Sequence, residues 1–284
     1  MRGFMKIIFL LSGLFLLSWL FFAQSCMSFR KSDAEEKTEF AKSHVKLHTS
    51  TLYVDGRQIH YALTGDDTLP TIFFIHGSPG SWNAFSEYMK DSLLLKKFRM
   101  VSVDRPGFGY SDFGQVQHLD VQSFLISPLF YHLSNQKPTF LAGHSLGGPM
   151  VIKLAADNPR IFAGLVVISG SIDPREEKPE KWRPWLFKTP LNYFVPGALR
   201  PSNEELWYLK KDLIQLEKDF SKVTCPVYFI HGMIDTWVPP GNVAYGKKLL
   251  INAPLVEETM IPDANHFIPW SKFTEIRAVL LKLY

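Results

Sequence analysis

The residues best suited to chemistry surround a serine that stands between two glycines, in the run Gly143-His144-Ser145-Leu146-Gly147. A nucleophile on a sharp turn needs small residues two positions before and after it, because strand and helix must approach each other there. An apolar segment from Thr139 precedes the run, and apolar residues at helical spacing follow it to Ala156. This context favours a nucleophilic serine over the alternative, a glycine-rich turn around an ordinary serine.

A serine hydroxyl is a weak nucleophile at neutral pH, so it needs a base that accepts its proton and later returns it. Imidazole suits that role, and the chain has nine histidines. His144 stands beside the serine, whereas His76 and His231 end apolar segments. His266 lies in a polar loop after an apolar stretch, where a base can be presented to the serine.

A base of this kind also needs a carboxylate that fixes its tautomer. Asp235 comes just after an apolar, strand-like segment, and Asp173 follows the preceding one, so both are candidates. Asp263 is too close to His266 in the chain for this role, and a turn or helix-capping role fits it better.

The elements that would position these residues alternate between strands and helices. A hairpin is expected first, with an Asp-Gly turn at 55–56. Continuous apolar runs, typical of strands buried on both faces, alternate afterwards with helical patterns. We expect the strands at 71–75, 99–103, 140–142, 164–168 and 227–230, and helices at about 81–95, 119–133 and 149–156. Such alternation favours a mainly parallel sheet with helices on both faces.

Four separated segments then carry a family resemblance: His76-Gly77-Ser78-Pro79-Gly80, Asp104-Arg105-Pro106-Gly107-Phe108-Gly109-Tyr110-Ser111, the run around Ser145, and finally Asp235 with His266. In types and order they resemble the α/β-hydrolase-fold proteins, over nearly the whole chain beyond Leu47. The resemblance implies a mainly parallel central sheet flanked by helices, with a helical cap insertion.

The resemblance also implies roles for these residues. Ser145 would be the nucleophile, His266 the base and Asp235 the orienting acid, with Asp173 as the alternative acid. Backbone N–H groups of Ser78 and Leu146 would form the oxyanion hole, since negative charge develops on the carbonyl oxygen under attack.

The segment 173–222 interrupts the alternation with six prolines and several aromatic residues. It is too long for an ordinary connection, so we expect a cap between two parts of the core, 47–172 and 223–284. The clear helix in it is expected near 202–219. Candidate substrate-binding residues are Trp82, His144, Trp182 and Trp185, although packing between cap and sheet explains the aromatic ones equally well.

The first 26 residues are expected to form a signal or membrane anchor, because two positive charges precede the apolar run 7–23. The run ends in Ala23-Gln24-Ser25-Cys26, which resembles a bacterial lipobox with Cys26 as the lipidated residue, although Ala23 stands where the pattern usually has Leu. Residues 27–46 are charged and are expected to form a linker or a short surface helix. The sequence therefore predicts an exported or membrane-associated bacterial envelope protein.

Composition excludes other classes. Without Arg2 and Lys6 the chain has 29 basic and 27 acidic residues, which is no footprint for nucleic acid. Two cysteines in different settings make no disulfide framework. The sequence shows no nicotinamide fingerprint, phosphate loop or metal-ligand spacing, so we expect no cofactor and no metal.

The predicted function is hydrolysis of carboxylic esters or thioesters through an acyl-Ser145 intermediate. Dehalogenases and epoxide hydrolases of the fold have Asp at the nucleophile position, and dienelactone-type hydrolases have Cys. Prolyl aminopeptidases of the fold have Gly where this chain has Ser78. An amidase or carbon–carbon bond hydrolase with the same residues is an alternative, and so is a binding protein without catalysis.

Overall fold

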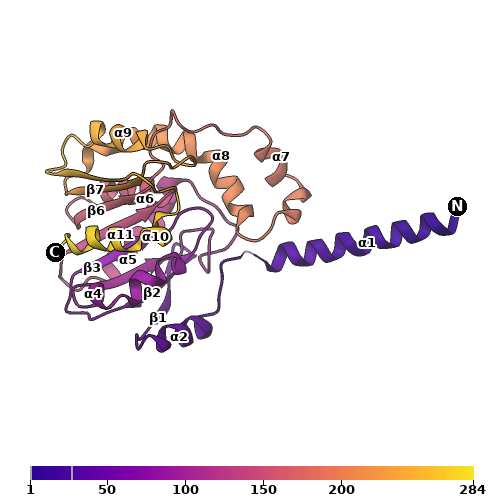
Figure 1. Ribbon diagram of the computed structural model, residues 1–284, viewed down its shortest axis with the longest axis horizontal. Helices are drawn as coiled ribbons and strands as arrows, with labels where there is room; N and C mark the ends of the chain where they lie inside the picture. The colour runs from indigo at the N-terminus through magenta and orange to yellow at the C-terminus, as the bar shows by residue number, and fades with distance from the viewer. Residues whose placement is uncertain (1, 27) are drawn as a thin grey trace.

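The structure is a computed structural model that describes residues 2–26 and 28–284. An eight-stranded sheet runs through it in the order β1-β2-β4-β3-β5-β6-β7-β8 (Figure 1). β2 pairs antiparallel with β1 and with β4, and the other neighbours pair parallel. This mainly parallel sheet confirms the predicted architecture.

The strands are short, and the carboxyl ends of all of them except β2 lie at the same edge of the sheet. They are β1 His48–Val54, β2 Arg57–Thr64, β3 Thr71–Ile75, β4 Arg99–Val103, β5 Thr139–His144, β6 Phe162–Ile168, β7 Val227–Gly232 and β8 Val256–Ile261. The β1–β2 hairpin turns at Asp55 and Gly56, whose φ angles of 49° and 73° are those of the tight turn expected from an Asp-Gly pair.

Helices fill most connections. They are α1 Arg2–Ser25, α2 Asp33–Lys42, α3 Ser86–Lys90, α4 Ser92–Leu95, α5 Leu119–His132, α6 Gly147–Asp157, α7 Arg183–Phe187, α8 Leu199–Leu216, α9 Gly241–Leu249, α10 Ile268–Ser271 and α11 Phe273–Leu281. Three 3₁₀ helices are η1 Trp82–Phe85, η2 Pro190–Phe194 and η3 Glu217–Lys222.

The core has two layers, one on each face of the sheet. Alternate residues of β3 enter different layers, because successive side chains of a strand point to opposite faces. Phe73 and Ile75 pack with α5, α6 and η3, whereas Ile72 and Phe74 pack with α3, α4 and α11. The unalternating apolar run of this strand is explained by burial on both faces.

Two local expectations needed correction. The helix expected at 81–95 is divided into η1, α3 and α4, because the Asp91 carboxylate accepts from the amides of Leu93 and Leu94 and starts a new helix. The helix expected at 202–219 is α8, which begins at Leu199 and ends at Leu216. Between residues 28 and 46, one of the two expected alternatives, a short surface helix, forms as α2, and its Phe40 is fully buried against the body.

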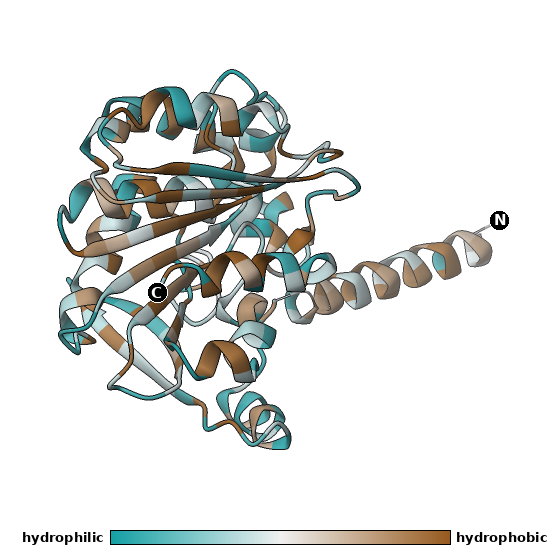
Figure 2. Ribbon diagram, turned by 60° about the vertical axis from the view of Figure 1, so that its left-hand side comes forward, coloured by the Kyte–Doolittle hydropathy of each residue, from teal (hydrophilic) through white to brown (hydrophobic). Residues whose placement is uncertain are grey.

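Helix α1 extends away from the body and meets it only at its carboxyl end (Figure 1). Apolar residues lie along its whole length (Figure 2). Among the described residues it is the single helix with the length and composition to cross a membrane, a test that a signal sequence also passes.

Candidate active site

Ser145 lies on the turn between β5 and α6. Its φ of 57° is strained for a non-glycine residue, and such strain is typical of functional turns. The glycines on either side permit the turn. A Cβ on Gly143 would lie 2.1 Å from the Gly147 carbonyl oxygen, and a Cβ on Gly147 would lie 2.2 Å from that of Ile75. Neither position has room for a side chain.

Hydrogen bonds join Ser145, His266 and Asp235 in one chain. Ser145 Oγ donates to His266 Nε2 over 3.0 Å, and His266 Nδ1 donates to Asp235 Oδ2 over 2.8 Å. The three side chains come from the carboxyl ends of β5, β7 and β8, and all are buried. The structure thus brings together three residues that the sequence predicts to act together, and we call Ser145, His266 and Asp235 the triad.

The surroundings of Asp235 keep it ionised. Its Oδ1 accepts from the amides of Trp237 and Val238 at 2.9 and 2.8 Å, leaving Oδ2 for His266. Burial alone would raise the pKa of this carboxyl, but the hydrogen bonds from His266 and Val238 outweigh it and the pKa is lowered. An ionised carboxylate at this place favours the His266 tautomer with a proton on Nδ1.

The alternative acid, Asp173, is not brought to His266. Its carboxylate faces Arg175, whose Nη2 donates to Oδ2 over 2.6 Å. Its amide donates to Asn242 Oδ1, which fixes the loop after β6. Asp235 is therefore the better candidate.

The two predicted oxyanion donors come from different loops: Ser78 follows β3, and Leu146 directly follows the nucleophile. Among the described residues, the N–H groups of Ser78 and Leu146 donate no hydrogen bond. Ser78 Oγ is buried and also has no partner there. Gly77 brings the loop against the nucleophile, since a Cβ on it would lie 2.9 Å from Ser145 Cβ. The loop can therefore direct donors toward a substrate oxygen at Ser145.

The peptide between Gly77 and Ser78 is held from its carbonyl side. The Gly77 oxygen accepts from Arg105 Nη2 over 3.0 Å and from His76 Nδ1 over 2.7 Å. His76 Nε2 accepts from the Arg105 amide, so the ring is neutral with its proton on Nδ1. Burial, followed by the Arg105 charge, lowers the pKa of His76 well below its usual value. Because a peptide is planar, anchoring the carbonyl also orients the Ser78 N–H.

His144 supports the base and does not face open solvent. Its Nε2 donates to the His266 carbonyl oxygen over 3.0 Å, and its ring lies 4.8 Å from that of His266. Burial, together with the nearby His266, lowers the pKa of His144 to about 3. We therefore assign His144 a positioning contact with the base and no contact with substrate.

The predicted aromatic contacts are dispersed. Trp82 is 2% exposed and packs in the core against Phe40, with ring centroids 6.1 Å apart, so core packing accounts for it. Trp182 directly precedes α7 and Trp185 lies within it, both with half or more of their surface exposed, and Trp182 stacks with Arg183. No described contact joins any of the three to the triad residues.

Other aromatic residues, which the sequence analysis did not single out, surround His266. The ring of Trp237 stacks on that of His266 with centroids 5.7 Å apart, Phe267 packs edge-on against both rings, and Trp270 packs against Phe267. All three are at least 41% exposed. Their place one to four residues after Asp235 or His266 was the signal available in the sequence. They form an apolar rim at the triad, which we call the aromatic rim.

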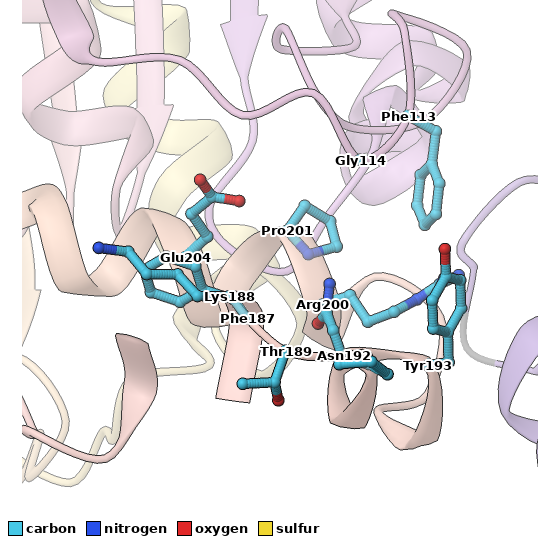
Figure 3. A pocket seen from close by; sticks show the side chains of 11 residues that line it. Phe113, Gly114, Phe187, Lys188, Thr189, Asn192, Tyr193, Arg200, Pro201 and Glu204 are labelled. Atoms are coloured by element: carbon cyan, nitrogen blue, oxygen red, sulfur yellow. The ribbon is translucent and has the colours of Figure 1, made fainter. Parts of the chain in front are cut away.

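A cavity of about 420 Å³ lies apart from the triad, between the cap and the loop after β4 (Figure 3). It is lined by Phe113, Gly114, Phe187, Lys188, Thr189, Pro190, Asn192, Tyr193, Arg200, Pro201 and Glu204. None of the triad residues is among them.

Comparison with known proteins agrees with this architecture. A family model described as "alpha/beta hydrolase fold" matches residues 70–202. The sn-1-specific diacylglycerol lipase of Mus musculus is 33% identical over 37% of this chain and 34% of its own length. The monoglyceride lipase of Rattus norvegicus is 29% identical over 44% of this chain and 43% of its own. The chain thus matches less than half the length of these curated relatives.

Solved structures match more of the chain. One is the crystal structure of a membrane phospholipase A, a bacterial virulence factor, with a TM-score of 0.63 at 18% identity. The match covers 100% of this chain and 99% of that chain. At that identity the likeness shows the fold alone. The sheet order, the matched family model and these neighbours together show that the chain has the α/β-hydrolase fold.

Proposed function

We propose that this chain is a serine hydrolase that cleaves carboxylic esters or thioesters. The observation that supports it best is the hydrogen-bonded chain from Ser145 through His266 to Asp235 at the carboxyl edge of the sheet. The lipases among its relatives favour the same class. The presence of all three hydrogen-bonded residues argues against a binding protein without catalytic activity.

The chemistry proceeds in two halves. Ser145 Oγ bonds to the carbonyl carbon while its proton passes to His266 Nε2, and Asp235 stabilises the imidazolium. The carbonyl oxygen becomes negative and is met by the N–H groups of Ser78 and Leu146. The bond to the leaving alcohol or thiol breaks as His266 gives that group its proton, which leaves acyl-Ser145. Water, deprotonated by His266, then releases the acid.

The aromatic rim supports an apolar acyl group in the substrate. Exposed aromatic surface next to a nucleophile is suited to an alkyl chain, because burying apolar area contributes about 25 cal/mol per Å². We propose further that the N-terminal helix directs the chain to a membrane, as an export signal or anchor, since it is apolar on every face and almost wholly unburied.

A fluorophosphonate probe tests the class. Folded full-length protein should be labelled on Ser145, and Ser145→Ala should not be labelled, whereas Ser221→Ala, in η3, should be labelled like the parent. Absence of labelling in the parent would refute the enzyme assignment. A panel of p-nitrophenyl esters of graded chain length, with matched thioesters and amides, then defines the bond and acyl length.

A further inference from the structure

Helix α1 is attached to the cap by three hydrogen bonds near its carboxyl end. Trp19 Nε1 donates to the Phe194 carbonyl over 3.1 Å, and Gln24 Nε2 donates to that of Tyr193 over 2.7 Å. The Gly197 amide donates to the Ala23 carbonyl over 2.9 Å, and Ala23 is fully buried. The helix is therefore fixed to residues 193–197 of the cap.

This attachment sets the depth of the cap in a bilayer that α1 crosses. Trp19 lies six residues before the end of the helix, or about 9 Å along its axis. Tryptophan is enriched at the membrane–water interface, so the cap segment bonded to it lies at headgroup depth. This placement of the cap at headgroup depth rests on the proposed membrane role of α1. The side of the body that carries α1 would thus face lipid headgroups.

Two arginines meet at that place over one aromatic ring. The Arg30 guanidinium lies 4.4 Å from the centre of the Phe113 ring, and that of Arg200 lies 5.7 Å from it. Arg30 is exposed and Arg200 is half-buried. Two guanidinium groups that share one ring repel each other unless an anion lies between them. Burial, and secondly the charge of Arg30, lowers the pKa of Arg200.

Within residues 2–26 and 28–284, neither Arg30 nor Arg200 forms an ion pair with a carboxylate. Asp112, next to Phe113, is bonded to Arg57 over 2.6 Å. Figure 3 shows Arg200 extending toward Tyr193 and Phe113, whereas Glu204 lies at the other end of the cavity.

We propose that Arg30 and Arg200 bind the phosphate of a bilayer phospholipid, with the adjoining cavity receiving part of its headgroup. Arginine matches phosphate because its planar guanidinium donates two parallel N–H bonds. The phosphate lies at the depth where Trp19 places the cap. A phospholipid held there keeps the cap against the bilayer, so that apolar esters can reach the triad from the membrane.

Native mass spectrometry of the full-length chain in maltoside micelles tests the site, with palmitoyl-oleoyl-phosphatidylglycerol as the probe. Arg30→Gln/Arg200→Gln should bind the first phospholipid about tenfold more weakly or worse than the parent. The control Lys96→Gln/Arg160→Gln removes two exposed charges elsewhere and should bind it like the parent. Arg30→Gln alone, at an exposed position that cannot disturb the core, should weaken binding several-fold.

Two competitors identify the source of the phosphate. Dioleoylglycerol, which has no phosphate, should bind parent and arginine variant alike, and inorganic phosphate should displace the phospholipid only at far higher concentration. Equal phospholipid affinity in the arginine and control variants would overturn the proposal. Displacement of the phospholipid by inorganic phosphate at a concentration similar to that of the phospholipid would also overturn it. Ser145→Ala should bind the phospholipid like the parent, so a failure of the proposed hydrolysis would be seen separately.

Discussion

Arg105 and Glu205 form a buried ion pair that joins the loop after β4 to helix α8 of the cap, with Nη2 2.9 Å from Oε2. Arg105 is fully buried and Glu205 is 5% exposed. The same guanidinium holds the carbonyl oxygens of His76 and Gly77. One side chain thus connects the cap to the peptide that presents the Ser78 N–H.

Single and double substitutions of this pair should separate its contribution to the free energy of unfolding from its contribution to kcat. Arg105→Met leaves Glu205 as an unpaired buried charge and should cost about 3–5 kcal/mol of unfolding free energy. Arg105→Met/Glu205→Leu should recover most of that stability, because an apolar pair can replace a buried ion pair. Its kcat should stay about tenfold or more below the parent with little change in KM, because the Gly77 carbonyl has lost a donor. Urea unfolding and ester kinetics measure the two quantities, and recovery of both together would contradict the role.

The orienting acid can be identified by two amide substitutions. Asp235→Asn keeps the shape of the side chain but removes the charge that fixes the His266 tautomer, so kcat should fall about 10³–10⁴-fold. Asp173→Asn disturbs only a contact with exposed Arg175 and should stay within a few-fold of the parent. Steady-state kinetics on one p-nitrophenyl ester is sufficient, and the reverse ranking would make Asp173 the acid.

His144 should make stability depend on pH. Its folded pKa of about 3 lies below the unfolded value near 6.5, so the unfolded chain binds the extra proton and stability is lost as pH falls below about 6.5. At pH 5 this one group should cost about 2 kcal/mol relative to neutral pH. In His144→Gln the unfolding free energy should fall less steeply between pH 7.5 and 5. Urea titrations across that range measure the slope, and parallel curves would show that His144 does not contribute.

The glycine before Ser145 should be intolerant of even one methyl group. In Gly143→Ala the new Cβ would lie 2.1 Å from a backbone oxygen and 2.8 Å from Val151, so the turn must open. We expect a loss of about 2 kcal/mol or more in stability and loss of fluorophosphonate labelling. Gly241→Ala is the matched control, since its Cβ would meet nothing within 4 Å. Thermal unfolding and fluorophosphonate labelling measure the two effects. If Gly143→Ala behaved like Gly241→Ala in both, the prediction would be wrong.

Much of the fold was predictable because its signals are local. The apolar run that forms β3 and the glycines at 143 and 147 report burial and close approach directly. The meeting of Ser145, His266 and Asp235 was predictable from the family resemblance, since nothing in the spacing brings residues 121 and 31 positions apart into contact.

Contacts made only through folding were not predictable. Trp82 and Trp237 are the same residue type beside loops of the sheet edge, yet one is buried in the core and the other is 67% exposed at His266. Arg105 read as part of a loop motif, and its partner Glu205 lies 100 positions later in α8. Composition cannot predict whether such a residue is buried or which residue it pairs with, because both depend on which surfaces face each other after folding.

The buried position of Ala23 bears on how the chain matures. A peptidase that removes a signal after this segment, or a lipoprotein pathway that cuts before Cys26, must reach backbone that the folded cap covers. Either cut would also remove Trp19 and Gln24, and with them the attachment to the cap. Removal of this segment and its docking on the cap therefore exclude each other in any one molecule.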